Sequence, residues 1–113
     1  MKLHATESDT QRAILDYLAM KKIYAWRNNA GSQIIRNGDK FYRIISGPKG
    51  SSDIVGCLPD GRFLAIEVKR FDGQLSKEQI EFLERIISLG GVAFMAKSID
   101  DVIKQFSFFE VKL

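Results

Sequence analysis

Apolar residues recur at helical spacing in three segments of the chain. Capping boxes that begin at Thr6 or Ser8 and at Ser76 precede the first two of these segments. We therefore predict helices from Thr6 or Ser8 to residue 20, from Ser76 to the Gly90-Gly91 pair, and over residues 99–105. The apolar side of the second helix is expected to consist of Ile80, Leu83, Ile86 and Ile87.

Short apolar runs typical of strands fill most of the remaining chain. The Asn37-Gly38 pair favours a tight type I′ turn, because both central residues of that turn need a positive φ, and it predicts a hairpin. Pro59-Asp60-Gly61 marks a second turn. The predicted strands cover residues 23–28, 33–36, 40–45, 53–58, 62–69, 92–96 and, at an edge, 108–111.

The order of the elements predicts the fold class. The chain runs through a helix, three or four antiparallel strands, a helix, a strand and a helix. A strand that follows a long crossover helix is expected to lie parallel to its neighbour, so the sheet should be mixed, with helices on its faces. No repeat or linker-like stretch divides the chain, and residues 1–113 are predicted to form one α/β domain with a mixed central sheet flanked by helices.

The composition narrows the class of protein. With 45% hydrophobic and 27% charged residues, a chain of 113 residues is neither disordered nor collagen-like. No apolar run approaches the roughly 18 residues of a membrane helix, and residues 1–4 lack the apolar stretch of a signal peptide. The single cysteine, Cys57, cannot form an internal disulfide or a zinc cluster, and we expect it to be a small buried residue. An intracellular, cytoplasmic protein without a membrane partner is the natural expectation.

Positive charge is concentrated in one quarter of the chain. The net charge is +3, but residues 21–49 hold seven basic residues and one acidic residue, Asp39. Tyr24, Trp26, Phe41 and Tyr42 are interleaved with these charges, a pattern that suits a nucleic acid, whose phosphates are neutralised by cations and whose bases stack on rings. The alternative is a solvated hairpin face. The candidate nucleic-acid-binding residues are Arg27, Arg36, Lys40, Arg43 and Lys49, the last of which lies in a Gly-Pro-Lys-Gly loop that is either a phosphate contact or a plain turn.

The strand predicted at residues 62–69 carries an acid and a base on one face. Side chains alternate along a strand, so Leu64, Ile66 and Val68 share a face that we expect to be core. Glu67 and Lys69 lie on the opposite face, where they need partners if they are buried. A simple ion pair between these two residues is one explanation.

Asp53 favours a second explanation, a metal site. A hairpin centred near Asp60 pairs residues whose numbers sum to about 120, which places Asp53 opposite Glu67. Two carboxylates this close repel each other, and a divalent cation relieves the repulsion. Oxygen ligands without His or Cys favour Mg²⁺ or Mn²⁺. The carbonyl of Val68 is a candidate third ligand.

Together these residues resemble the signature of the PD-(D/E)xK nucleases, and their surroundings resemble its VRR-NUC branch, the virus-type replication-repair nucleases. The resemblance runs from Glu7 to about residue 102. One departure is Ser52, where the signature has a proline that binds no metal. The matching segments are Glu7, Gly50-Ser51-Ser52-Asp53, Ile66-Glu67-Val68-Lys69, Gly73-Gln74-Leu75-Ser76 with Gln79, and Gly90-Gly91-Val92.

The resemblance implies a restriction-endonuclease-like αβββαβ core and a role for each matching residue. Asp53, Glu67 and the Val68 carbonyl would hold the metal, and Lys69 would position the attacking water and offset charge in the transition state. Gln79 would face the site, or else serve only in the capping box. Glu7 would reach the metal through water, or else only favour the start of its helix.

The resemblance also implies a substrate and an assembly. Stand-alone members of this branch are small, often phage-encoded, and implied to act in DNA repair by cutting branched DNA, such as four-way (Holliday) junctions, as homodimers. Surplus apolar surface for a dimer is offered by the Phe106, Phe108, Phe109 cluster or by Tyr24 with Trp26. Two alternatives remain: a nucleic-acid-binding module of the same fold without turnover, and a restriction-type duplex endonuclease, which would normally need a longer chain for base readout.

Overall fold

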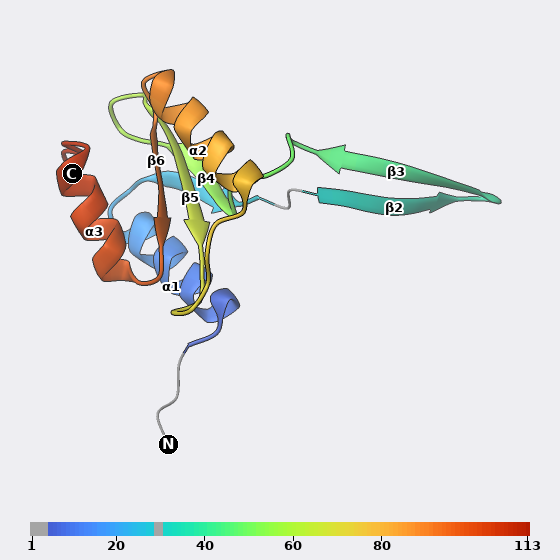
Figure 1. Ribbon diagram of the computed structural model, residues 1–113, viewed down its shortest axis with the longest axis horizontal. Helices are drawn as coiled ribbons and strands as arrows, with labels where there is room; N and C mark the ends of the chain where they lie inside the picture. Colours follow the sequence, from blue (N-terminus) through green and yellow to red (C-terminus); the bar gives the residue numbers. More distant parts are fainter. Residues whose placement is uncertain (1–4, 29–30) are drawn as a thin grey trace.

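A computed structural model describes residues 5–28 and 31–113, with the backbone alone described at 31–34 and 43–46. Within these residues the chain forms three helices and six strands (Figure 1). In chain order they are α1 (Glu7–Met20), β1 (Tyr24–Arg27), β2 (Gly31–Asn37), β3 (Lys40–Ser46), β4 (Ile54–Cys57), β5 (Phe63–Val68), α2 (Lys77–Ser88), β6 (Val92–Ala96) and α3 (Ile99–Phe108).

Four of the strands form a mixed sheet in the order β1-β4-β5-β6. The β1–β4 and β4–β5 pairs are antiparallel, whereas β6 lies parallel to β5 after the α2 crossover. The predicted fold class, α/β with a mixed central sheet flanked by helices, is confirmed. None of the helices in the described part of the chain is long and apolar enough to cross a membrane.

The main core lies between the sheet and the helices α1 and α3, while α2 covers part of the other face (Figure 1). Leu64, Ile66 and Val68 of β5 are buried in this main core, as their alternation predicts. On the α2 side, Leu83 packs against Ala65 and Ala93 in a smaller cluster. The two faces of β5 therefore have different surroundings, and the face with Glu67 is the one beneath α2.

The hairpin of β2 and β3 is a separate two-stranded sheet. Its strands pair in register from Gly31 with Ser46 to Asn37 with Lys40, so the central residues of the turn are Gly38 and Asp39. Only Gly38 of these two has a positive φ, 65°, which is the pattern of a type II′ turn, so the expected type I′ turn over Asn37-Gly38 was wrong. The hairpin prediction is confirmed, with strands longer than predicted. In Figure 1 the hairpin extends away from the four-stranded sheet.

Three other local expectations were wrong. Residues 108–111 form no strand, because Phe106 extends the buried stripe begun by Val102 and the helix α3 continues to Phe108. Ile80 and Ile87 are exposed, since α2 turns Leu83 and Ile86 toward the sheet instead. Cys57 is exposed, because it lies over a part of the sheet that α2 leaves open.

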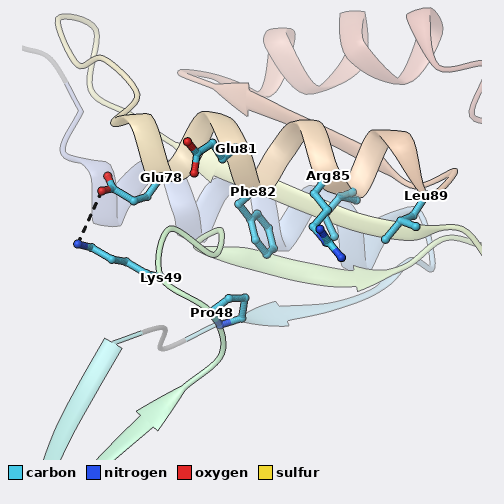
Figure 2. A pocket seen from close by; sticks show the side chains of 8 residues that line it. Pro48, Lys49, Glu78, Glu81, Phe82, Arg85 and Leu89 are labelled. Carbon is cyan, nitrogen blue, oxygen red and sulfur yellow. Dashed lines mark ion pairs between the residues drawn. The ribbon is translucent and has the colours of Figure 1, made fainter.

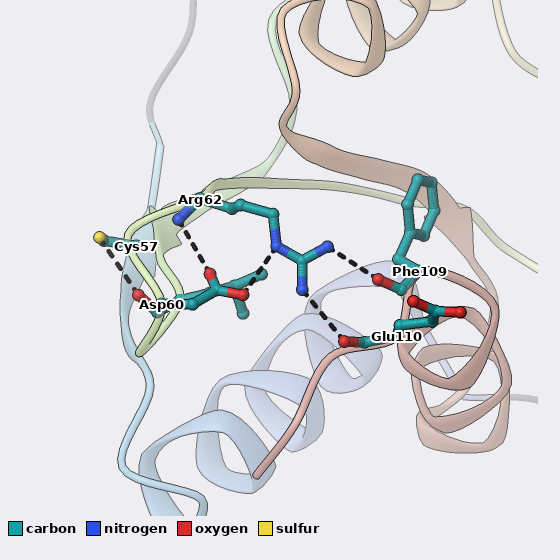
Figure 3. A network of polar contacts seen from close by, with 6 residues as sticks. Cys57, Asp60, Arg62, Phe109 and Glu110 are labelled. Atoms are coloured by element: carbon teal, nitrogen blue, oxygen red, sulfur yellow. Dashed lines mark hydrogen bonds and ion pairs between the residues drawn. The ribbon is translucent and has the colours of Figure 1, made fainter.

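The turn between β4 and β5 is fastened to the end of α3 by Arg62 (Figure 3). The Arg62 guanidinium pairs with Asp60 at 2.8 Å and donates to the backbone carbonyls of Phe109, at 2.7 Å, and Glu110, at 3.2 Å. Carbonyls at the end of a helix lack helical partners, so this arginine satisfies them and holds the hairpin that carries Asp53 and Glu67 against the core.

Candidate active site

The register of the β4–β5 hairpin brings Asp53 and Glu67 together at one end of the two central strands of the sheet. Ile54 pairs with Ile66, so that Asp53, just before β4, faces Glu67 near the end of β5. The Asp53 Oδ2 accepts a hydrogen bond from the backbone N–H of Val68 at 2.8 Å. This bond fixes one carboxylate beside the other.

The loop that presents Asp53 is held from two sides. Asn28, which follows β1, donates from Nδ2 to the Ser52 carbonyl at 3.0 Å, and its N–H donates to the Asp53 carbonyl at 2.7 Å. On the other side Gly50 lies so close to α2 that a Cβ would sit 2.4 Å from the Glu78 carbonyl oxygen. Ser52 is buried, and its hydroxyl has no hydrogen-bond partner among the described residues, so the polar atom in place of the proline adds no bond.

Glu67 is a buried acid, 3% exposed. Its Oε1 accepts a hydrogen bond from the Gln79 Nε2 at 2.9 Å and lies 3.6 Å from the Lys69 Nζ. Its Oε2 is buried and has no hydrogen-bond partner among the residues that the structure describes. Burial, and then the nearby Asp53 carboxylate, raise the pKa of Glu67 to about 8, against the opposing effect of Lys69.

Gln79 makes both of the contacts that the sequence left as alternatives. Its Oε1 accepts from the Ser76 N–H at 2.9 Å, which completes the capping box at the start of α2. Its Nε2 meanwhile donates to Glu67. The first turn of α2 therefore orients the Glu67 carboxylate with a side chain that is itself fixed at both ends.

Glu7 lies at the margin of this group. Its Oε1 accepts from the backbone N–H of Arg70, one residue beyond Lys69, at 3.3 Å. Ala5, Thr6, Glu7 and Arg70 line a recess of about 270 Å³. The start of α1 is thereby placed next to the end of β5.

The donor set fits a hard divalent cation. Residues 5–28 and 31–113 contain no group of three or more His, Cys, Asp or Glu side chains that could hold a metal. A cation at this site would instead be bound by two carboxylates and one backbone carbonyl. The unpartnered Oε2 of Glu67 is the atom that a cation would satisfy. Oxygen ligands of this kind suit Mg²⁺ or Mn²⁺.

The basic candidates fall into two groups. Arg27 and Lys49 belong to the segments that border Asp53: Arg27 is paired with Ile54, on the face of the sheet opposite Glu67, and Lys49 forms a 3.7 Å ion pair with Glu78 of α2 (Figure 2). Arg36 and Lys40 lie at the far end of the β2–β3 hairpin. The side chain of Arg43 lies outside the described residues.

Sequence reasoning missed Asn28. In the sequence, Asn28 marks the start of a polar break after a strand. No local pattern distinguishes an asparagine that holds a distant loop from one that faces solvent. Its partners, Ser52 and Asp53, are more than twenty residues away along the chain.

A carboxylate opening one strand of a hairpin, a Glu-x-Lys at the end of the other strand, and a mixed sheet flanked by helices together define the class of PD-(D/E)xK nucleases. Residues 5–100 match the model of the VRR-NUC domain. The chain therefore belongs to the VRR-NUC family, as the sequence motifs indicated, and is a nuclease of PD-(D/E)xK type. Nucleases of this type generally use a divalent metal. A comparison with curated proteins gave no match.

Proposed function

We propose that this protein is a Mg²⁺- or Mn²⁺-dependent endonuclease that hydrolyses phosphodiester bonds in branched DNA, such as four-way junctions, in the cytoplasm. The observation that carries the metal-dependent chemistry is the Asp53–Glu67 pair, in which one buried carboxylate oxygen has no partner within residues 5–28 and 31–113 while Lys69 lies beside the other oxygen of Glu67. A purely structural ion pair between Glu67 and Lys69 would not require the second acid, Asp53, or the Oε2 of Glu67 that has no partner among the described residues.

Each residue at the site has a separate task in this proposal. Asp53, Glu67 and the Val68 carbonyl would hold the cation, whose charge would serve to polarise the phosphate and activate water. Gln79 orients Glu67 through its Nε2, which binds one carboxylate oxygen and leaves the other without a partner among the residues described. Lys69 positions the attacking water and offsets negative charge that develops on the phosphate. Glu7 acts from the margin as an outer acid.

Binding of DNA is assigned to the five basic residues. Arg27 and Lys49 lie on the segments that border Asp53, and Arg36 and Lys40, with Arg43 from the sequence, extend the positive charge along the hairpin. Each cation placed at a phosphate releases counterions, so binding should weaken steeply with salt.

A homodimer would place two such sites on one junction, because each site cuts one strand and two-fold symmetry is the commonest oligomer symmetry. Phe106 is buried in the core, which weakens the case for the C-terminal aromatic cluster. Tyr24 and Trp26 are 76% and 48% exposed, with ring centroids 5.3 Å apart, on the half of the sheet that α2 leaves open. Beside it, α2 and the loop before β4 enclose a groove of about 570 Å³ (Figure 2). We propose that a second copy covers this β1 face.

The test is an assay on matched linear, flap and four-way-junction DNA with Mg²⁺, Mn²⁺ or EDTA. Asp53→Asn and Glu67→Gln should abolish cleavage and weaken Mn²⁺ binding in calorimetry while the protein stays folded. Glu84→Gln, an exposed acid on α2, is the matched control and should cut like the parent. Normal cleavage by either site variant would refute the metal assignment, and binding without cleavage by the parent would make the protein a DNA-binding module.

Lys69→Ala separates chemistry from affinity. We expect the single-turnover rate to fall by roughly a hundredfold or more, because charge stabilisation in a buried site is lost, with little change in DNA affinity. Lys77→Ala, an exposed lysine on α2, serves as the control. An unchanged rate for Lys69→Ala would remove this residue from the mechanism.

A further inference from the structure

The β2–β3 hairpin, residues 31–46, forms an arm that pairs with no other strand in the part of the chain that the structure describes. It makes the molecule long, with principal extents of 51 × 43 × 29 Å. The Cα radius of gyration is 15.3 Å, against about 13 Å for a compact domain of this length. An isolated two-stranded hairpin is marginally stable in water, so the arm is a segment that a binding partner would stabilise.

Both faces of the outer arm carry a cation beside a ring. Residues paired across the strands share a face, so Arg36 and Phe41 lie on one side, and the Arg36 guanidinium sits 6.0 Å from the Phe41 ring centroid. Lys40 and Tyr42 lie on the other side. Phe41 is 69% exposed and Tyr42 is 48% exposed.

The root of the arm adjoins the candidate metal site. At one end Asn28 lies three residues before the first residue of the described arm strand, Gly31, and donates its N–H to the carbonyl of Asp53. At the other end Lys49 and Gly50 lead from the arm into the loop that carries Asp53. A DNA strand bound at the carboxylates would therefore run past the root of the arm, where Asn28 and Lys49 lie.

We propose that the arm enters the major groove of the duplex on one side of the scissile phosphate, an inference that rests on the proposed endonuclease function. The major groove of B-DNA is about 12 Å wide and accommodates a two-stranded β-ribbon. When a ribbon enters this groove edge-on, each of its two faces is turned toward one of the two phosphate backbones. The arm has a cation on each face to contact them. Strands of seven residues extend about 23 Å, or roughly seven base pairs.

The charge of the arm favours DNA over a second protein chain as the occupant. Its formal charges are Arg36, Lys40 and Arg43 against Asp39, a surplus of two positive charges, with Arg27 and Lys49 at the root. Cores of protein–protein interfaces are depleted in lysine, whereas a nucleic-acid groove attracts it. Rings beside the cations supply the flat apolar contact that sugars and base edges accept.

The experiment places one bulky C5-substituted pyrimidine, which projects into the major groove, at successive positions on each side of the cleavage point of the best-cut substrate. We expect affinity of the parent protein to fall about tenfold for modifications within roughly seven base pairs on one side, and not beyond. The double variant Arg36→Gln/Phe41→Ser should bind unmodified DNA about tenfold more weakly and lose this position dependence. Ile103→Ser/Lys104→Gln, an exposed apolar–cation pair on α3, should retain both properties.

The outcomes separate this proposal from the one on which it rests. Cleavage by the parent protein that no major-groove modification affects, or an interference pattern that the arm variant retains, would overturn the groove assignment while leaving the nuclease intact. If the arm variant became monomeric with unchanged DNA affinity per site, the arm would be a contact between copies of the chain. Failure of the parent to cut any DNA would instead refute the proposed function.

Discussion

At the scale of single residues, the protein maintains an acid in a place where a charge is unfavourable. Glu67 is nearly inaccessible to solvent, and the groups that face it are the Asp53 carboxylate, the Lys69 ammonium and the Gln79 amide. The amide and the ammonium both approach Oε1, which leaves Oε2 without a partner among the described residues. A carboxyl group in these surroundings keeps its proton near neutral pH unless a cation replaces it.

The raised pKa of Glu67 predicts how the metal-free protein responds to pH. Between about pH 4.5, its ordinary pKa, and about pH 8, the folded protein holds a proton that the unfolded chain has released. The free energy of unfolding should therefore fall as the pH rises through this range, by up to about 1.4 kcal/mol per pH unit. Urea unfolding in EDTA at a series of pH values measures this slope.

Glu67→Gln is the control, because it removes the titrating group and keeps the shape of the side chain. The unfolding free energy of the parent minus that of this variant should decrease from pH 5 to pH 8. Contributions from other titrating groups cancel in this difference. At pH 8, added Mn²⁺ should stabilise the parent more than the variant. A difference that does not depend on pH would show that Glu67 has an ordinary pKa.

At the scale of elements, the site depends on the fit between the first turn of α2 and the loop before β4. Gly50 has a φ of 83°, and it lies where a methyl group would overlap the backbone of Glu78 and Gln79. Gln79 also reaches Glu67 from this same turn. The glycine therefore sets the spacing between the loop that carries Asp53 and the helix that orients Glu67.

Replacing Gly50 with alanine should accordingly lower the free energy of unfolding more than the same change at a glycine that has only a positive φ. Gly61 has a φ of 91°, and no described atom lies within 4 Å of the point that a Cβ would occupy there, so Gly61→Ala should cost about 1–2 kcal/mol from strain alone. Gly50→Ala should cost more, because backbone atoms must also move, and it should weaken Mn²⁺ binding.

Thermal unfolding and Mn²⁺ titration of the two variants measure these effects side by side. Equal losses of stability, or unchanged Mn²⁺ affinity in Gly50→Ala, would show that the loop and α2 are not coupled in this way.

At the scale of the whole molecule, α2 covers only part of its side of the sheet. Ala65 and Ala93 lie beneath α2, whereas Tyr24, Trp26 and Cys57 lie on the same face over β1 and β4 and remain exposed. An open face rich in aromatic residues is typical of a surface that another protein covers.

The dimer prediction follows from this open face. Light scattering at micromolar concentration should give about twice the mass of the chain, and Trp26→Ser should shift it toward the monomer. Phe108→Ser is the matched control, because Phe108 is 78% exposed but lies on α3. A monomeric parent protein that nicks linear duplex as fast as junctions would leave the nuclease chemistry and remove the junction-resolving role.

The sequence by itself determined the fold class, the pairing of the hairpins and the elements other than the strand expected at residues 108–111, because these depend on local signals. Apolar periodicity, capping boxes and turn residues act between neighbours along the chain. The short connection between β4 and β5 left one register, so that Asp53 faces Glu67. Residues 5–100, which match the VRR-NUC domain, run from the start of α1 into α3.

Only the tertiary structure decided what covers each face and which distant side chains meet. Alternation assigns a residue to a face but does not say whether a helix lies over that face, so Cys57 was expected to be buried and is exposed. The separation of the arm from the main sheet is likewise a tertiary feature. The hold of Asn28 on the Asp53 loop and the bond from Gln79 to Glu67 each join separate segments of the chain. Such contacts arise from the packing of the whole chain, which no short stretch of residues specifies.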